Sequence, residues 1–122
     1  MAAQSDKLVI ILSKGIDSEM SSVGFTLANG AITNGLKPFV FLTSAAVDLV
    51  RKGGQQMTHV APLSPLAQMI GDFLDRGGTI WVCPPCAQTR GYGAEDLLDR
   101  VAITGGSAMF AEIKAGAAVM CF

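Results

Sequence analysis

Hydrophobic residues along the chain fall into short apolar runs that alternate with longer segments of helical spacing. The runs Lys7–Ser13, Lys37–Thr43 and Thr79–Cys83 are continuous and rich in β-branched or aromatic residues. Such runs are typical of strands buried in a parallel sheet. Briefer runs at Val101–Thr104 and Ala117–Cys121 bring the expected number of strands to about five.

The segments between these runs predict helices. The segment after the first strand has helically spaced apolar residues (Met20, Val23, Phe25, Leu27 and Ala31) and a stop at Asn34-Gly35. A second helix is expected to open at Pro65, with one apolar face made by Leu66, Met69, Ile70, Phe73 and Leu74, and to end at Gly77-Gly78. Shorter helices are predicted over 45–53, capped by Ser44, and over 94–100 and 107–116.

This alternation predicts a single α/β domain over residues 1–122. We expect a flavodoxin-like fold of three layers, in which helices cover both faces of a parallel sheet of about five strands. Half of the residues are hydrophobic and the mean hydropathy is +0.43. The longest apolar run, Leu8–Leu12, is far shorter than the ~18 residues of a membrane span. The apolar excess therefore predicts a buried sheet and contacts in a homo-oligomer.

Charge and cysteine content narrow the function classes. The net charge is −1 and the sequence has no basic patch, which argues against nucleic acid as a partner. The first ten residues lack the pattern of a signal peptide, so we expect a cytoplasmic protein whose thiols stay reduced. Its three cysteines are then expected to be reactive, metal-bound or buried, since a disulfide framework does not suit that compartment.

The strongest candidate for chemistry is the stretch WVCPPCAQTRGY at 81–92. Cys83 ends a strand, at the sheet edge where α/β proteins gather their chemistry. The two prolines suit the first turn of a helix, which places Cys83 at or beside the helix N-cap and Cys86 in the first turn. Unpaired N–H groups and the helix dipole stabilise a thiolate there, Arg90 one turn on adds positive charge, and Gly91 allows the helix to stop.

Three kinds of chemistry compete for the cysteine pair, besides an inert buried Cys83. A thioredoxin-type dithiol fits the CxxC spacing, but no later proline exists to lie opposite the motif. A structural zinc site needs four ligands, usually from two pairs. Cys83 and Cys86 form one pair, but His59 and Cys121 are isolated in the sequence, so we expect no metal. The third is persulfide chemistry, which needs a reactive thiolate and a partner surface but no cofactor.

Other polar segments are weaker candidates. The loop after the first strand, with Ser13, Lys14 and Gly15, lacks the spacing of a phosphate loop but is expected to line the same cleft. The TGGS turn at 104–107 is predicted to be a tight turn with Ser107 as helix N-cap. His59 is expected in an irregular loop and Cys121 buried in the sheet or an interface. Among the acidic side chains, Glu95, Asp96 and Asp99 are predicted to form a solvated face.

The chain resembles the DsrE/DsrF-like group, which includes sulfur-relay subunits. The resemblance rests on KLVIILSKG, FTLANGAITNGLKPFVFLTSAAVDLV, GGTIWVCPPCAQTRGYGAEDLL and SAMFAEIKAGAAVMCF. It implies a small doubly wound α/β fold, a trimer or hexamer, and a cysteine that carries persulfide sulfur between donor and acceptor proteins. Cys83 and Arg90-Gly91 occupy the family's places, so Cys83 is expected to be the acceptor and Cys86 a resolving or supporting thiol. A dithiol oxidoreductase and a non-catalytic oligomer that binds a small ligand near Ser13–Ile16 remain alternatives.

Overall fold

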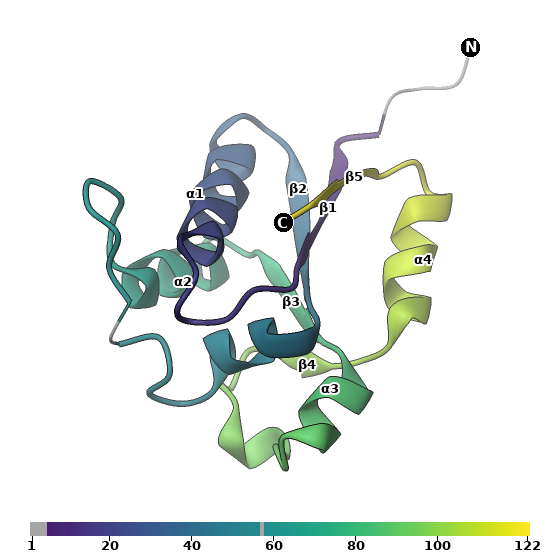
Figure 1. The fold of residues 1–122 in the computed structure, drawn as a ribbon. Helices are drawn as coiled ribbons and strands as arrows, with labels where there is room; N and C mark the ends of the chain where they lie inside the picture. Colours follow the sequence, from purple (N-terminus) through teal and green to yellow (C-terminus); the bar gives the residue numbers. More distant parts are fainter. Residues whose placement is uncertain (1–4, 57) are drawn as a thin grey trace.

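A single parallel sheet forms the centre of the molecule (Figure 1). The computed structural model describes residues 5–56 and 58–122. Within them the strand order is β4-β3-β2-β1-β5, and all neighbouring pairs are parallel. The strands are β1 (Lys7–Leu12), β2 (Lys37–Leu42), β3 (Thr79–Val82), β4 (Ala102–Ile103) and β5 (Ala118–Cys121). The predicted parallel sheet of about five strands is confirmed.

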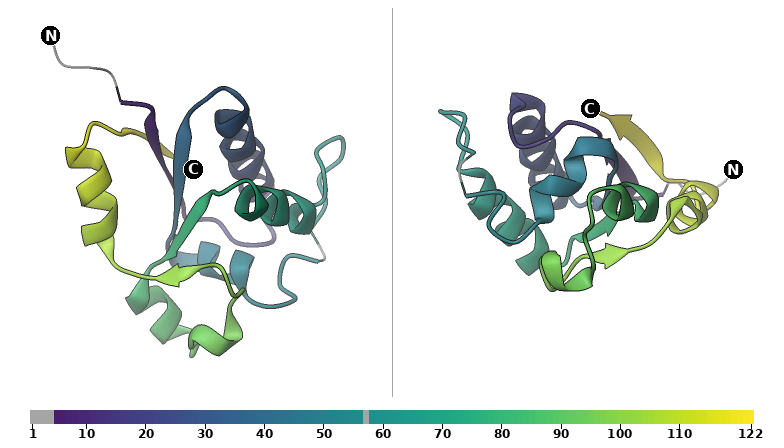
Figure 2. Two further views of the ribbon diagram at one scale, coloured as in Figure 1. Left: turned by 180° about the vertical axis from the view of Figure 1, so that it is seen from behind. Right: turned by 60° about the horizontal axis from the view of Figure 1, so that its bottom comes forward.

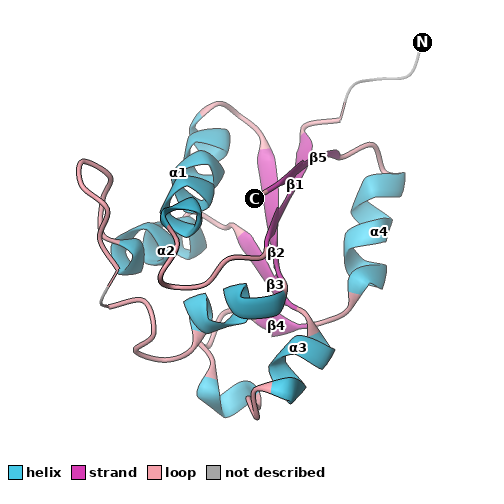
Figure 3. Cartoon of the chain, viewed as in Figure 1, coloured by secondary structure: helices cyan, strands magenta, loops and turns pink. Residues whose placement is uncertain are grey.

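Helices cover both faces of this sheet, as a three-layer fold requires. The α-helices are α1 (Glu19–Thr33), α2 (Leu66–Asp75), α3 (Pro84–Thr89) and α4 (Gly106–Lys114), and two 3-10 helices are η1 (Ser44–Val50) and η2 (Ala94–Asp96). Helices α1 and α2 lie on one face and α4 on the other (Figures 1 and 2). Strands and helices alternate along nearly the whole chain, and α3 with the 3-10 segments gathers at one end of the sheet (Figure 3).

The main core lies between the sheet and the pair α1 and α2. Alternate residues of β1, Leu8, Ile10 and Leu12, belong to this core, because successive strand side chains point to opposite faces. Phe25 of α1 meets Phe73 of α2 edge to face, with ring centroids 5.9 Å apart. The register of the sheet, in which Leu42 lies beside both Leu12 and Val82, makes β1, β2 and β3 end side by side at the site described below.

Three local expectations are wrong. The segment 45–53 forms the 3-10 helix η1, and Ser44 is its first residue instead of its cap, since Ser44 adopts a left-handed conformation with φ 55°. The predicted helix over 94–100 is one 3-10 turn, because Leu97 turns extended and buries its side chain. At α4 the cap position is Gly105, two residues before the expected Ser107.

Two glycines of α1 should respond oppositely to alanine. A Cβ at Gly24 would lie 2.5 Å from Cδ2 of the buried Leu12, whereas Gly30 has no such neighbour within 4 Å. Gly24→Ala should therefore lower the free energy of unfolding by about 1–3 kcal/mol. Gly30→Ala should raise it by roughly 0.5–1 kcal/mol. Urea unfolding of both variants checks this, and equal stability would contradict the close packing of α1 on β1.

Candidate functional site

The cysteine motif emerges at the carboxyl edge of the sheet, beside the end of β2. Leu42 of β2 pairs in register with Val82 of β3, so the residues that follow them, Thr43 and Cys83, leave the sheet side by side. The backbone N–H of Cys83 donates to the carbonyl of Leu42 at 2.9 Å, which fixes this junction. The strand-end position expected for Cys83 is thereby confirmed.

Helix α3 starts at this junction. Cys83 is the N-cap residue, Pro84 and Pro85 open the first turn, and the N–H of Ala87 donates to the Cys83 carbonyl at 3.0 Å. Proline suits the first turn because it has no N–H to leave unpaired. Cys86 therefore lies in the first turn, as the sequence predicts, and both cysteines are half-buried free thiols.

The sulfur of Cys86 contacts both residues that follow β2. The backbone N–H of Ser44 donates to Cys86 Sγ at 3.2 Å, and Thr43 Oγ1 lies 3.6 Å from the same atom. Ser44 has φ 55°, a conformation that costs a non-glycine residue about 1–3 kcal/mol. The strained backbone of Ser44 is therefore the segment whose N–H donates to the sulfur of Cys86. The sequence did not identify Thr43 and Ser44 as site residues, because no local pattern shows that β2 and β3 are adjacent strands.

These contacts separate the two thiols electrostatically. The Ser44 N–H, followed by the Thr43 hydroxyl, lowers the pKa of Cys86, and Arg90 adds a smaller effect in the same direction. Burial raises the pKa of Cys83, partly offset by the backbone N–H of Cys86. The Cys83 thiol also interacts with the Cys86 sulfur, which favours a neutral Cys83 and a charged Cys86. The site therefore combines one thiol whose pKa is lowered with one whose pKa is raised.

The first cause of the lowered Cys86 pKa lies outside α3, in the Ser44 N–H on a neighbouring segment. Stabilisation of a thiolate by the dipole of α3, which has six residues, stays a prediction. The activation of Cys86 thus depends on the packing of η1 against α3.

Arg90 and Gly91 close α3 beside the site. Arg90 donates to the Cys86 carbonyl at 3.3 Å and lies 3.9 Å from the Asp48 carboxylate. Gly91 has φ 74°, which glycine adopts without strain, and the N–H of Tyr92 then bonds back to Ala87 at 2.9 Å. The predicted place of Arg90 one turn beyond Cys86, and the helix stop at Gly91, are confirmed.

A second contact joins η1 to the end of α3. The hydroxyl of Tyr92 donates to Asp48 Oδ1 at 2.5 Å, and the Arg51 guanidinium lies 5.7 Å from the Tyr92 ring centroid. The hydrogen bond to Asp48 and burial raise the pKa of Tyr92. Together with the Ser44–Cys86 contact, this bond holds η1 and α3 at two points.

The Tyr92–Asp48 bond predicts a shifted phenol titration. Tyr92 is the one tyrosine of the sequence, so phenolate absorbance reports it alone. Asp48→Ala should return the Tyr92 pKa toward its ordinary value, while Asp72→Ala on α2 should leave it raised. Because the folded pKa is raised, the bond stabilises the fold below about pH 10 and its contribution is lost as pH rises through the folded pKa. An unchanged titration in Asp48→Ala would exclude the carboxylate as the cause.

The loop after β1 lies at the same edge of the sheet, and its hydrogen bonds join it to α1 and to the end of the chain. Both the N–H and the hydroxyl of Ser13 donate to the Phe122 carbonyl at 3.0 Å. The Ser21 hydroxyl donates to the carbonyls of Lys14 and Gly15 at 3.0 and 2.6 Å. In the described part of the chain, no hydrogen bond joins this loop to either cysteine. A ligand role for Ser13, Lys14 and Gly15 stays a prediction.

The remaining candidate side chains lie apart from one another. His59 is exposed in a loop, with Nε2 2.9 Å from the Leu63 carbonyl. Cys121 is exposed, so its expected burial in the sheet is wrong for the single chain, because β5 is an edge strand. Glu95 and Asp99 are solvated as predicted, while Asp96 caps the Gly93 N–H at 2.9 Å. Across residues 5–56 and 58–122, no three metal-ligating side chains form a group.

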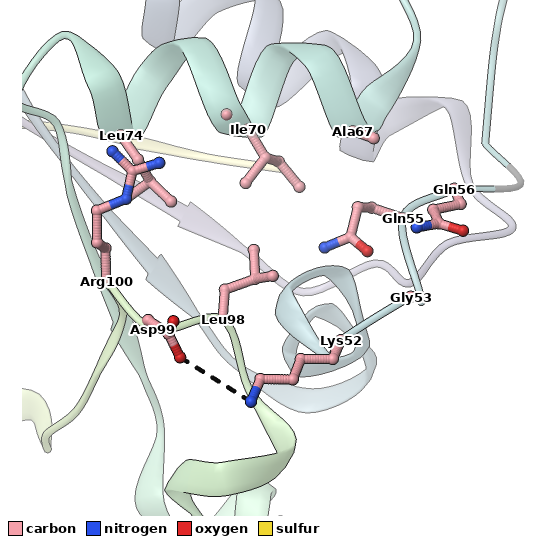
Figure 4. A pocket seen from close by; sticks show the side chains of 11 residues that line it. Lys52, Gly53, Gln55, Gln56, Ala67, Ile70, Leu74, Leu98, Asp99 and Arg100 are labelled. Carbon is pink, nitrogen blue, oxygen red and sulfur yellow. Dashed lines mark ion pairs between the residues drawn. The ribbon is translucent and has the colours of Figure 1, made fainter.

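A pocket of about 400 Å³ lies between α2 and the segments around Lys52 and Asp99 (Figure 4). Its apolar wall includes Ile70, Leu74 and Leu98, and Lys52 Nζ lies 3.9 Å from Asp99 Oδ1 at its edge. Neither cysteine lines it, and the loop 13–15 lines none of the three pockets described.

The fold and the site define a doubly wound α/β protein with a dithiol at the carboxyl edge of its sheet. The chain belongs to the DsrE/DsrF-like family, which it matches over residues 6–122. It is 30% identical over 101 residues to the uncharacterized protein MJ0760 of Methanocaldococcus jannaschii. That match covers 82% of this chain but only 37% of the relative's length.

Solved structures share the same fold. The ychN protein from E. coli has a TM-score of 0.75 at 21% identity, covering 98% of this chain and all of that one (100%). MTH1491 from Methanobacterium thermoautotrophicum has a TM-score of 0.74 at 14% identity, and the match covers 95% of this chain and 98% of that one. BT1422 from Bacteroides thetaiotaomicron has a TM-score of 0.72 at 20% identity, and the match covers 99% of this chain and 100% of that one. In the described part of the chain, no helix combines the length and apolarity that crossing a membrane requires.

Proposed function

We propose that the protein carries persulfide sulfur, with Cys86 as the acceptor thiolate. The family to which the chain belongs is associated with sulfur relay. The single observation that carries the proposal is the Ser44 N–H, which donates to Cys86 Sγ at 3.2 Å and lowers the pKa of Cys86. A thiolate is the form of cysteine that attacks a sulfane sulfur.

This proposal divides the roles differently from the sequence-based expectation. Cys83 was expected to accept the sulfur and Cys86 to support it. Burial raises the pKa of Cys83, whereas hydrogen bonds lower that of Cys86, so Cys86 is the better nucleophile near neutral pH. Arg90 keeps the supporting role that the sequence suggests, because its charge favours the Cys86 thiolate.

Sulfur loading of single-cysteine variants tests the proposal. The protein is incubated anaerobically with glutathione persulfide, and the intact mass is followed for wild type, Cys86→Ser and Cys83→Ser. Cys121→Ser is the control, because that thiol is exposed on β5, outside the site. We expect Cys86→Ser to lose the mass gain of one sulfur atom, and Cys83→Ser and Cys121→Ser to keep it. Loading that survives without Cys86 would overturn the proposal.

The expected partners and assembly are part of the same proposal. A carrier without a cofactor needs a cytoplasmic donor protein and an acceptor protein that both reach Cys86. We also propose a homo-oligomer, because α4 has no buried residue and the apolar side chains of Ile103, Phe110 and Val119 are exposed by 38%, 58% and 45%. The proposed subunit number, a trimer or hexamer, rests on the family resemblance. Light scattering of the purified protein measures the subunit number, and a monomer at micromolar concentration would contradict this part.

A further inference from the structure

We propose that Cys83 discharges the sulfur held on Cys86 as hydrosulfide and leaves the two cysteines joined as a disulfide. This inference rests on the proposed persulfide chemistry of Cys86 and adds the fate of the sulfur. It gives the site a second product when no acceptor protein takes the sulfane sulfur. It also assigns a task to the thiol that the loading step does not use.

The geometry of the α3 start brings the two sulfurs together. Cys83 is the N-cap and Cys86 lies three residues on, and side chains at these two positions share one side of the first helical turn. The Cys83 thiol interacts with both the backbone N–H and the sulfur of Cys86. Pro84 and Pro85 restrict the backbone between them, which holds the two cysteines at these positions of the turn.

The discharge step balances in atoms and electrons. The Cys83 thiolate attacks Sγ of the Cys86 persulfide, a bond forms between the two cysteine sulfurs, and the bond to the outer sulfur breaks. The outer sulfur takes up two electrons and leaves as hydrosulfide with the proton that Cys83 has lost. The cysteine pair, taken together, loses these two electrons as it becomes a disulfide. A dithiol reductant of low potential returns the pair to thiols before the next cycle.

The surroundings of Cys83 make this discharge slow at neutral pH. Burial raises the pKa of Cys83, so few molecules carry the attacking thiolate. The charged or titratable groups nearby are Cys86 and Arg90 on or at the end of α3, Asp48 on η1, and Tyr92 after α3. The persulfide is therefore kept long enough for an acceptor to take it, and release should quicken about tenfold per pH unit until Cys83 titrates.

Released sulfide and the protein mass test the discharge together. The full chain, in a Cys121→Ser background, is loaded anaerobically with one equivalent of glutathione persulfide and freed of small molecules. Matched samples carry Cys83→Ser, Cys83→Ala or Cys86→Ser. We expect the chain with both cysteines to release hydrosulfide at least about tenfold faster than either Cys83 variant, because its attack is intramolecular. Its mass should fall to two hydrogens below that of the reduced protein.

Each outcome separates this inference from the proposed function. A persulfide that is equally long-lived with and without Cys83 would overturn the discharge and leave sulfur carriage by Cys86 intact. A Cys83–Cys86 disulfide that forms without released sulfide would also overturn it and would favour the dithiol oxidoreductase. If no variant loads sulfur, the proposed function fails first, and the discharge fails with it. The Cys83 variants measure the spontaneous loss of sulfur. Sulfide release that depends on pH only in the chain with both cysteines identifies the attack by Cys83.

Discussion

Iodoacetamide at pH 7 should modify Cys86 at least about tenfold faster than Cys83. The thiolate is the reacting form, and its fraction changes tenfold per pH unit below the pKa. Hydrogen bonds, the Ser44 N–H first, lower the pKa of Cys86, so its reactivity persists as pH falls, whereas burial raises that of Cys83 and delays its reactivity to higher pH. Intact mass against time, at several pH values, measures both rates.

The two rates are read from variants that keep one site cysteine each. Cys83→Ser and Cys86→Ser are compared in a Cys121→Ser background, which removes the exposed third thiol. The mutual influence of the pair is lost in these variants, but the first cause of each shift, the Ser44 N–H or burial, remains. A Cys83 that reacts as fast as Cys86 at pH 7 would contradict the assignment of the thiolate.

Removing the Thr43 hydroxyl should lower the reactivity of Cys86 at pH 7 by about threefold to tenfold. Valine keeps the branched shape of threonine but lacks the group that lies 3.6 Å from Cys86 Sγ. The Thr43 hydroxyl is the second influence that lowers the Cys86 pKa, so Thr43→Val should raise that pKa and reduce the thiolate fraction. The alkylation rate of Cys86 in the Cys83→Ser background measures the effect.

A matched substitution on α3 controls for general effects of the exchange. Thr89 is exposed, and its hydroxyl donates to the Pro85 carbonyl at 2.9 Å instead of to sulfur. Thr89→Val should therefore leave the Cys86 rate within about twofold of the parent. If both threonine variants slow Cys86 equally, the hydroxyl at 43 has no special effect on the sulfur.

The fold followed from local signals that the chain carries strongly. The apolar runs around Leu8–Leu12 and Lys37–Leu42 are unbroken, and glycines or proline mark the ends of α1 and α2, so the strands, helices and layers could be predicted. Cys83 and Cys86 were placed correctly for a similar reason. Their spacing and the two prolines specify a helix start, whatever the rest of the sheet does.

The parts that escaped prediction depend on contacts between distant segments. Thr43 and Ser44 meet Cys86 because β2 and β3 are neighbours, and no local pattern gives the strand order. A serine with φ 55° breaks the ordinary preference of its residue type, so the left-handed start of η1 could not be anticipated. Cys121 was expected to be buried in the sheet or in an interface, and it is exposed in the single chain because β5 is an edge strand, whereas its burial in an interface stays a prediction.

The position of the first sulfane sulfur on the unmodified chain tests the central claim most directly. The protein with all three cysteines is exposed anaerobically to less than one equivalent of glutathione persulfide and quenched by alkylation at the earliest times. Fragmentation of the peptide that carries both site cysteines then locates the extra sulfur. The account predicts it on Cys86, the thiol that accepts the Ser44 N–H. Sulfur found first on Cys83, or on Cys121 alone, would contradict it.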